Sequence, residues 1–206
     1  DRPLPLVVQP AQGALNLTTW AATQTDWIEE RLRYHGGILF RGFAPDGTAG
    51  EGTAGLEQFL QVLGGDLLDY AYRSTPRTQV SGKVYTSTEY PASQTIPLHN
   101  EMAYSRQWPM KIAFLCVQPA VWGGTTPIAD SRQVYQALPE ELRSRWQQRQ
   151  VLYVRNYGGG LDLPWQTVFQ TEDRSAVEAF CRANGLTWDW GRGDRFCTRQ
   201  VCQAVA

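Results

Sequence analysis

The order of apolar and polar positions predicts helices that alternate with extended segments, and the chain shows no internal repeat. Apolar residues recur at helical spacing in residues 18–37, where a threonine would cap the helix and two glycines would end it. Further helices are expected at residues 56–65, 130–138, 139–149 and 172–185. The stretch 139–149 begins with a proline, which the first turn of a helix tolerates.

Runs of apolar, β-branched and aromatic residues predict the strands, and glycine and proline mark the loops. The strands are expected at residues 37–43, 82–91, 109–119, 151–157 and 196–206. The first looks central, and the run 109–119 is too apolar for an edge. The loops are expected at residues 45–55, 117–130 and 158–160. The pattern is typical of a single α+β domain over residues 1–206 with an antiparallel β core.

The composition and charge of the chain argue against several classes of function. The 19 Lys and Arg residues nearly balance the 20 Asp and Glu residues, which argues against nucleic-acid and anionic-membrane partners. No apolar run approaches the roughly 20 residues of a membrane span, and the first residues lack a signal-peptide pattern. The four cysteines form no CxxC pair, so reduced, buried thiols in a cytoplasmic protein are expected. Eight Trp and nine Tyr predict a core or cavity built from aromatic rings.

The segment "IPLHNEMAYS" contains the candidate metal ligands His99 and Glu101. Side chains two residues apart point to the same face of a strand. Imidazole and carboxylate together suit Fe(II), which a site of two histidines and one carboxylate holds with open positions. By itself, this pair is also compatible with a histidine that is simply hydrogen-bonded within the fold.

Longer blocks of sequence give the pair a context. "GILFRGF", "VYTSTEYPASQTIPLHNEMAYS", "WPMKIAFLCVQPAVWGGTTPIADSRQVYQALP" and "YVRNYGGGLDLPWQTVFQTED" resemble the taurine dioxygenase (TauD/TfdA)-like family of Fe(II)- and 2-oxoglutarate-dependent oxygenases, and within it the SyrP-like branch. The resemblance covers nearly all of the chain from Gly37 onward. It implies a distorted double-stranded β-helix (jelly roll) with flanking helices. It also implies a dioxygenase that uses Fe(II), 2-oxoglutarate and O2 to hydroxylate an unactivated C–H bond.

The resemblance assigns roles to three residues of this chain. His99 and Glu101 correspond to iron ligands, and Glu101 stands where many relatives have Asp and halogenases have a small residue. Thr126, in "GGTTPIAD", corresponds to a threonine that contacts 2-oxoglutarate, and its hydroxyl can donate a hydrogen bond to a carboxylate. From the residues alone, Thr125 and Thr126 could equally make an ordinary turn.

The resemblance also implies an amino-acid-like substrate of secondary metabolism, either free or tethered to a carrier protein. Polar residues near the pair and on the strand 151–157 are candidate substrate contacts, although each could be ordinary strand or loop polarity: Asn100, Tyr104, Arg106 and Arg155. Two other classes of function stay open. One is a non-catalytic jelly-roll protein that binds a small carboxylic acid, and the other is a cupin-like metal enzyme with a different third ligand.

Two residues that the family leads one to expect are missing from this sequence. No histidine follows His99, and no arginine occupies the family's late 2-oxoglutarate position. His35, the only other histidine, lies at a predicted helix end, where a basic side chain is favourable. The expectation from the sequence is therefore an oxygenase domain that lacks its C-terminal part.

Overall fold

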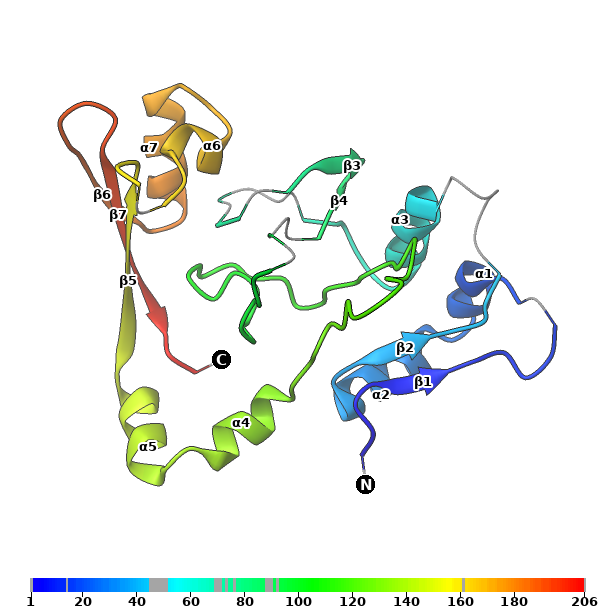
Figure 1. Ribbon diagram of the computed structural model, residues 1–206. Coiled ribbons are helices and arrows are strands. Elements are labelled where there is room, and N and C mark those ends of the chain that lie inside the picture. The colour runs from blue at the N-terminus through cyan, green and yellow to red at the C-terminus, as the bar shows by residue number, and fades with distance from the viewer. Residues whose placement is uncertain are drawn as a thin grey trace. The chain divides into compact units, whose positions relative to one another are not determined.

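The computed structural model describes residues 2–13, 15–44, 52–68, 72, 74–75, 77–87, 91, 93–160 and 162–205 (Figure 1). These residues form two compact units. Unit 1 comprises Asp1–Leu68, Arg77–Ser87 and Ile112–Val134, and unit 2 comprises Asp69–Pro76, Thr88–Lys111 and Tyr135–Ala206. Most of the predicted loop 45–55 and residues 88–90 of the predicted strand 82–91 lie outside the described residues.

Unit 1 contains a two-stranded parallel sheet, a two-stranded antiparallel hairpin and three helices. The strands are β1 (Leu6–Val8), β2 (Ile38–Phe40), β3 (Gln79–Ser81) and β4 (Val84–Tyr85), and the helices are α1 (Leu17–Ala22), α2 (Thr25–His35) and α3 (Gly52–Val62). Ala21, Ile28 and Phe59 form its buried core. Partly buried aromatic rings of α1, α2 and β2 pack against this core.

The N-terminal helix differs in detail from its prediction. The predicted helix 18–37 is divided into α1 and α2, and the cap of α1 is Asn16, whose side chain accepts a hydrogen bond from the Thr19 N–H at 2.7 Å. The predicted end is confirmed, since Gly36 closes α2 with φ 84°, a left-handed conformation that favours glycine. Strand β2 is confirmed within residues 37–43, but the prediction that it is central is wrong for the described sheet, where only β1 pairs with it.

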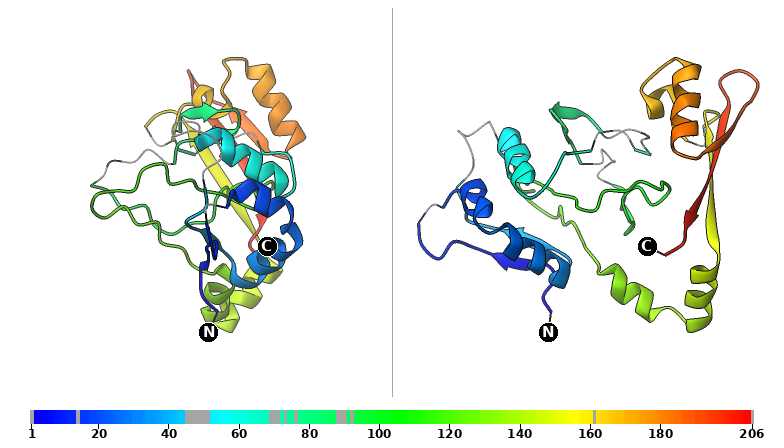
Figure 2. Two further views of the ribbon diagram at one scale, coloured as in Figure 1. Left: turned by 90° about the vertical axis from the view of Figure 1, so that its right-hand side faces the viewer. Right: turned by 180° about the vertical axis from the view of Figure 1, so that it is seen from behind.

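Unit 2 is built on a three-stranded antiparallel sheet in the order β5-β7-β6. Its elements are α4 (Ser131–Ala137, which begins in unit 1), α5 (Glu140–Gln148), β5 (Gln150–Tyr157), α6 (Trp165–Phe169), α7 (Arg174–Ala183), β6 (Thr187–Trp190) and β7 (Phe196–Gln203). The two ribbon views agree that α6 and α7 lie on the same side of this sheet (Figure 2). The predicted helices and the strands β5 and β7 are confirmed, whereas α6 and β6 were not predicted.

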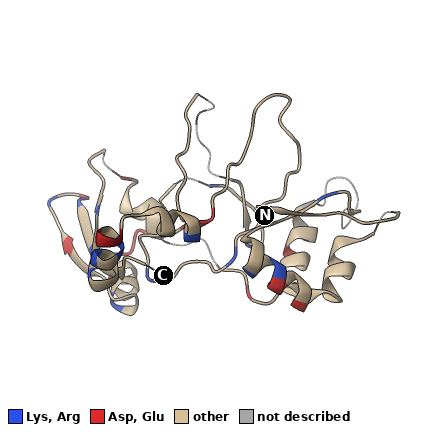
Figure 3. Cartoon of the chain, turned by 90° about the horizontal axis from the view of Figure 1, so that it is seen from below, with Lys and Arg blue, Asp and Glu red and all other residues tan. Residues whose placement is uncertain are grey.

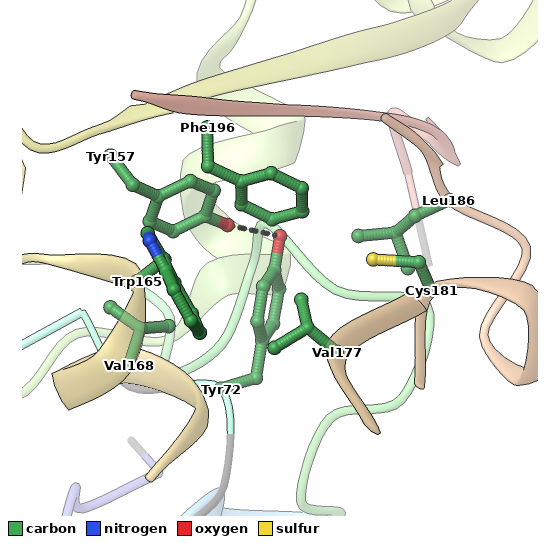
Figure 4. Close-up of a cluster of buried hydrophobic side chains, with 8 residues drawn as sticks. All are labelled: Tyr72, Tyr157, Trp165, Val168, Val177, Cys181, Leu186 and Phe196. Atoms are coloured by element: carbon green, nitrogen blue, oxygen red, sulfur yellow. Dashed lines mark hydrogen bonds between the residues drawn. The ribbon is translucent and has the colours of Figure 1, made fainter. Parts of the chain in front are cut away.

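Aromatic side chains fill the core of unit 2, as the composition predicted (Figure 4). Residues of the sheet, of α6 and α7 and two loop residues contribute to it: Tyr72, Tyr157, Trp165, Val168, Val177, Cys181, Leu186 and Phe196. Helix α7 supplies Val177 and Cys181 from one face, since residues four apart in a helix lie above one another. Burial raises the pKa of the Cys181 thiol to about 11, which keeps it protonated.

The segment 109–119 is not a strand, and this is the largest error of the prediction. No helix or strand is assigned to residues 109–119 in the structure. Its apolar side chains are exposed, with 63% of Phe114 and 77% of Val117 accessible. An apolar run becomes a strand only when a partner strand takes up its backbone N–H and C=O groups, and among the described residues none pairs with it.

The cysteines agree only in part with the prediction of buried thiols. The four cysteines are free thiols, but only Cys181 and Cys202 are buried, and Cys116 is exposed.

The α+β class is confirmed, while none of the described sheets closes into a barrel. None of the helices in the described part of the chain combines the length and apolar character needed to cross a membrane. Basic and acidic positions are interspersed in Figure 3, in keeping with the balanced charge.

Candidate metal centre

His99 and Glu101 lie together in an irregular segment of unit 2, and not on the strand that the sequence suggested. The His99 Nε2 atom is 3.8 Å from the Glu101 Oε2 atom. The His99 side chain is 56% exposed and that of Glu101 is 20% exposed, so the space between them is accessible from solvent. The two side chains therefore converge, which is the arrangement that a shared ligand requires.

A hydrogen bond at the other ring nitrogen orients His99. Its Nδ1 atom is 2.8 Å from the carbonyl oxygen of Pro97. A carbonyl can only accept, so Nδ1 donates in this bond and Nε2 is the ring nitrogen that faces Glu101. Ligating histidines are commonly oriented by such a bond, which fixes the tautomer and the ring plane.

The donor set fits a divalent metal of the iron type. One imidazole nitrogen and one carboxylate are two of the three ligands of a two-histidine, one-carboxylate site. His and carboxylate bonds to a divalent ion such as zinc are about 2.0–2.2 Å, so one ion can reach two donor atoms 3.8 Å apart. Within the part of the chain that the structure describes, no third His, Cys, Asp or Glu side chain joins this pair.

His35 has a structural role in unit 1. It is the last residue of α2, is only 6% exposed, and its Nδ1 atom lies 2.9 Å from the carbonyl oxygen of Pro3. The ring of Tyr34 meets it edge to face at 4.9 Å between centroids. The predicted position at a helix end is confirmed, and the ring bonds the N-terminal segment there.

A tight turn follows the pair. Met102 adopts φ 54°, which is unusual for a residue other than glycine, and the Ser105 N–H donates to the Met102 carbonyl at 2.9 Å. Tyr104 then leaves the turn toward the body of unit 2, and its hydroxyl donates to the Tyr72 carbonyl at 2.9 Å. The turn connects Glu101 to the aromatic core through only two intervening residues.

The structure brings two of the predicted substrate contacts, Tyr104 and Arg155, into direct contact. The Arg155 guanidinium carbon lies 4.7 Å from the centroid of the Tyr104 ring, and its Nε and Nη2 atoms bond the Asp162 Oδ2 at 3.0 and 2.9 Å. Two more tyrosine rings face it, with centroids at 4.7 Å for Tyr72 and 5.0 Å for Tyr157. We call these five residues the arginine cluster.

Sequence reasoning missed three members of the arginine cluster. Tyr157 could have been found, because it is two residues from Arg155 on the same face of β5. Burial raises the pKa of Tyr157 well above its ordinary value, so its hydroxyl stays neutral. Tyr72 and Asp162 carry no local signal, since both lie in irregular segments.

The remaining candidate contacts are more dispersed. Arg106 donates from Nε to the Val201 carbonyl at 2.8 Å, and it lines a pocket of about 290 Å³ with residues of β5 and β7 and with Trp108. Asn100 is exposed next to the pair. No described hydrogen bond links Arg106 to the arginine cluster.

Thr126 is exposed in a loop of unit 1, as the loop prediction 117–130 expected. Gly123 and Gly124 precede it with φ 70° and 67°, and a Cβ on Gly124 would come within 2.6 Å of the Ala120 Cβ. Glycine is therefore required there. His99 and Glu101 belong to unit 2, so the structure describes the two candidate sites separately.

An ion-pair clamp fixes the end of this loop. Arg132 donates to both oxygens of Asp130, at 2.9 and 3.0 Å, and Arg2 contacts the same carboxylate. The other Arg132 nitrogen, Nη1, donates to the Arg33 carbonyl at 2.9 Å, near the C-terminus of α2. The contacts with Arg2 and with the Arg33 carbonyl could not be read from the sequence, because these partners lie about a hundred residues or more from Asp130 and Arg132.

The clamp predicts an acid-dependent loss of stability. Hydrogen bonds from Arg132 lower the pKa of Asp130 despite the opposing effect of burial. A lowered folded-state pKa stabilises the fold at pH above the unfolded value of about 3.9, and this contribution is lost as the pH falls through the folded value. We expect Asp130→Asn to unfold more easily at pH 7, and to lose less stability than wild type between about pH 5 and pH 3.

Urea unfolding at a series of pH values would measure this difference. Asp189→Asn is the control, because it breaks the exposed pair of Asp189 with Arg199 and should leave the pH dependence nearly unchanged. Parallel stability curves for wild type and Asp130→Asn would show that the clamp does not contribute.

Comparison with known proteins identifies the family. The model of the family described as "Taurine catabolism dioxygenase TauD, TfdA family" matches residues 1–199. The chain belongs to the TauD/TfdA family. Over 178 residues it is 39% identical to the dapdiamide synthesis protein DdaC of Enterobacter agglomerans, and this alignment covers 86% of this chain and 53% of that protein. It is also 32% identical over 207 residues to a clavaminate synthase-like protein of Arabidopsis thaliana, covering 92% of this chain and 61% of that protein.

The chain matches only part of each relative. The chain spans between half and two thirds of the length of the two TauD/TfdA relatives that it matches. Both candidate sites fall within the matched residues 1–199. The family membership agrees with the resemblance that the sequence blocks showed.

Proposed function

We propose that the protein is an Fe(II)- and 2-oxoglutarate-dependent oxygenase that hydroxylates an unactivated C–H bond of an amino-acid-like substrate. The observation that carries this proposal is the convergence of His99 Nε2 and Glu101 Oε2, with the histidine tautomer set by Pro97. Membership of the TauD/TfdA family supports it. His99 and Glu101 would be iron ligands, and Thr126 would contact 2-oxoglutarate.

Each residue has a definable task in this proposal. Fe(II) supplies the oxidative chemistry when it is bound together with 2-oxoglutarate and O2, which yields succinate, carbon dioxide and the hydroxylated product. His99 and Glu101 hold the metal with positions left open. The Thr126 hydroxyl donates a hydrogen bond to a carboxylate of 2-oxoglutarate, and the preceding glycines let the backbone approach.

We also propose that the two units belong to one oxygenase domain with a distorted jelly roll. The family model spans both units, and the antiparallel sheet β5-β7-β6 is compatible with part of such a fold. The free thiols are compatible with a reducing compartment, in support of a cytoplasmic location.

The substrate class is proposed from the names of the relatives. One is named for dapdiamide synthesis and the other for likeness to clavaminate synthase, which supports a role in secondary metabolism. The substrate would be amino-acid-like, either free or tethered to a carrier protein. Four residues would be its contacts: Asn100, Tyr104, Arg106 and Arg155.

The direct test is turnover of 2-oxoglutarate by the purified full-length protein. Loaded anaerobically with Fe(II) and then exposed to O2, it should release succinate in proportion to the oxygen consumed. Saturable binding of 2-oxoglutarate without succinate would favour a non-catalytic binding protein. Metal-dependent turnover that ignores 2-oxoglutarate would favour a cupin-like enzyme.

Thr126→Val tests the co-substrate contact. The change preserves shape but removes one hydroxyl, and a hydrogen bond to a charged group contributes about 1.5–3 kcal/mol. The apparent KM for 2-oxoglutarate should therefore rise about 10- to 150-fold, while the affinity for Fe(II) changes little. Steady-state kinetics with varied 2-oxoglutarate and a metal titration provide the two numbers.

Thr125→Val is the matched control, since it makes the same change one residue earlier in the same exposed loop. It should be nearly silent in both measurements. The reverse result, in which only Thr125→Val raises KM, would place the co-substrate contact at Thr125.

A further inference from the structure

Arg155 is enclosed by aromatic rings to an unusual degree for a charged side chain. Its side chain is 10% exposed, and three tyrosine ring centroids lie within 5.0 Å of its guanidinium carbon. A guanidinium stacks on aromatic faces, and a buried charge also needs a partner of opposite sign, which Asp162 supplies at 2.9 Å. The guanidinium therefore packs against tyrosine rings, and one of its edges pairs with the Asp162 carboxylate.

The sheet supports the arginine cluster through Arg155 and Tyr157 of β5. Arg155 lies on β5 opposite Thr198 of β7. The Tyr157 hydroxyl donates to the Tyr72 hydroxyl at 3.1 Å and lies 3.0 Å from the Thr198 Oγ1. Figure 4 shows the first of these bonds inside the buried core. A side chain that packs on the rings of Tyr72 and Tyr157 therefore packs on the buried core of unit 2.

Tyr104 is the member of the arginine cluster that extends toward the metal pair. Its ring packs on Arg155, its hydroxyl bonds the Tyr72 carbonyl, and it follows Glu101 by three residues through the Met102 turn. The segment that carries His99 and Glu101 belongs to no helix or strand, so its own backbone ladder cannot hold the two ligands in place.

We propose that Arg155 is a positioning residue for the metal pair. By stacking on Tyr104, it fixes the end of the turn and so holds Glu101 at the distance from His99 that one metal ion can bridge. The inference rests on the proposed metal site and assigns Arg155 a task within it that acts through Tyr104. Groups that orient metal ligands typically change metal affinity 10- to 100-fold when they are removed.

The test measures Co(II) binding alone, without 2-oxoglutarate, by anaerobic titration and by the visible absorption of the bound ion. Arg155→Met should weaken Co(II) binding by about 10- to 100-fold and alter the spectrum. Arg155→Lys should recover only part of the affinity, because it keeps the charge but not the planar stack. Tyr104→Leu should weaken binding similarly, and the double variant should be little worse than either single variant.

One control variant and thermal unfolding separate positioning from general stability. Arg199→Met removes an arginine that pairs with an aspartate on the same sheet, Asp189, and should leave Co(II) affinity unchanged. Thermal unfolding of every variant identifies any that fail to fold, in which case Tyr104→Leu, on a partly exposed turn, decides the outcome.

The possible results are distinguishable. Wild-type protein that takes up no Co(II) overturns the proposed metal site and this inference with it. Wild-type binding together with unchanged affinity in Arg155→Met and Tyr104→Leu overturns only the inference. Additive losses in the double variant would show that Arg155 does not act through Tyr104, which also overturns it.

Discussion

His99→Ala should abolish succinate formation from 2-oxoglutarate and weaken Fe(II) binding by at least about 100-fold. The expected loss is large because the described site offers two ligands, and the variant keeps only the carboxylate of Glu101. The ring is exposed and its hydrogen bond is to a neighbouring carbonyl, so its removal should leave the melting temperature within a few degrees of wild type. Anaerobic metal titration, succinate release and thermal unfolding on one preparation would provide the comparison.

The other histidine supplies the control. His35→Gln alters a buried ring at the end of α2 and should lower stability without changing metal affinity in the folded protein. Glu101→Gln keeps the size of the second ligand but removes its charge, and it should resemble His99→Ala. Wild-type rates of succinate release by His99→Ala would eliminate His99 as a ligand.

The largest effect on stability is expected from Phe196→Ala. Phe196 is 2% exposed and packs in the core of unit 2, with ring centroids 4.1 Å from Trp190 and 5.3 Å from Tyr157. Removing a buried phenylalanine side chain leaves a cavity and typically costs about 3–5 kcal/mol. Urea unfolding followed by tryptophan fluorescence should show the loss as a lower midpoint with little change in slope.

Leu152→Ala is the matched control for this prediction. Leu152 lies on the neighbouring strand β5 but is 55% exposed, so its truncation should cost less than about 1 kcal/mol. Equal destabilisation by the two variants would mean that the aromatic core described for unit 2 does not carry its stability.

The local pattern of the sequence was sufficient where an element depends on its own residues. The helix 172–185 was predicted within a few residues from its local pattern. In the structure, apolar positions four apart lie on one face of α7, and the Asp173 side chain accepts a hydrogen bond from the Ser175 N–H. Strands β5 and β7 were predicted from dense β-branched and aromatic residues. The candidate pair His99 and Glu101 was likewise found from spacing, and their side chains do converge.

Prediction failed where an element depends on a partner that is distant along the chain. The run 109–119 has the composition of a buried strand, but a strand also needs a neighbour for its backbone hydrogen bonds, and no local pattern reports whether one is present. The pairing of β1 with β2 joins segments about 30 residues apart and was not predicted for the same reason.

By itself, the sequence determined the α+β class, the positions of most helices, the aromatic character of the core and the two candidate ligands. These follow from periodicity, capping and residue chemistry, which act over a few residues. Only the tertiary structure decided that the ligands lie in an irregular segment, that Tyr104 stacks on Arg155, and that Arg132 donates to the Arg33 carbonyl. Contacts such as that of Tyr104 with Arg155 join residues far apart in the chain, and they form only when packing closes the loops between them.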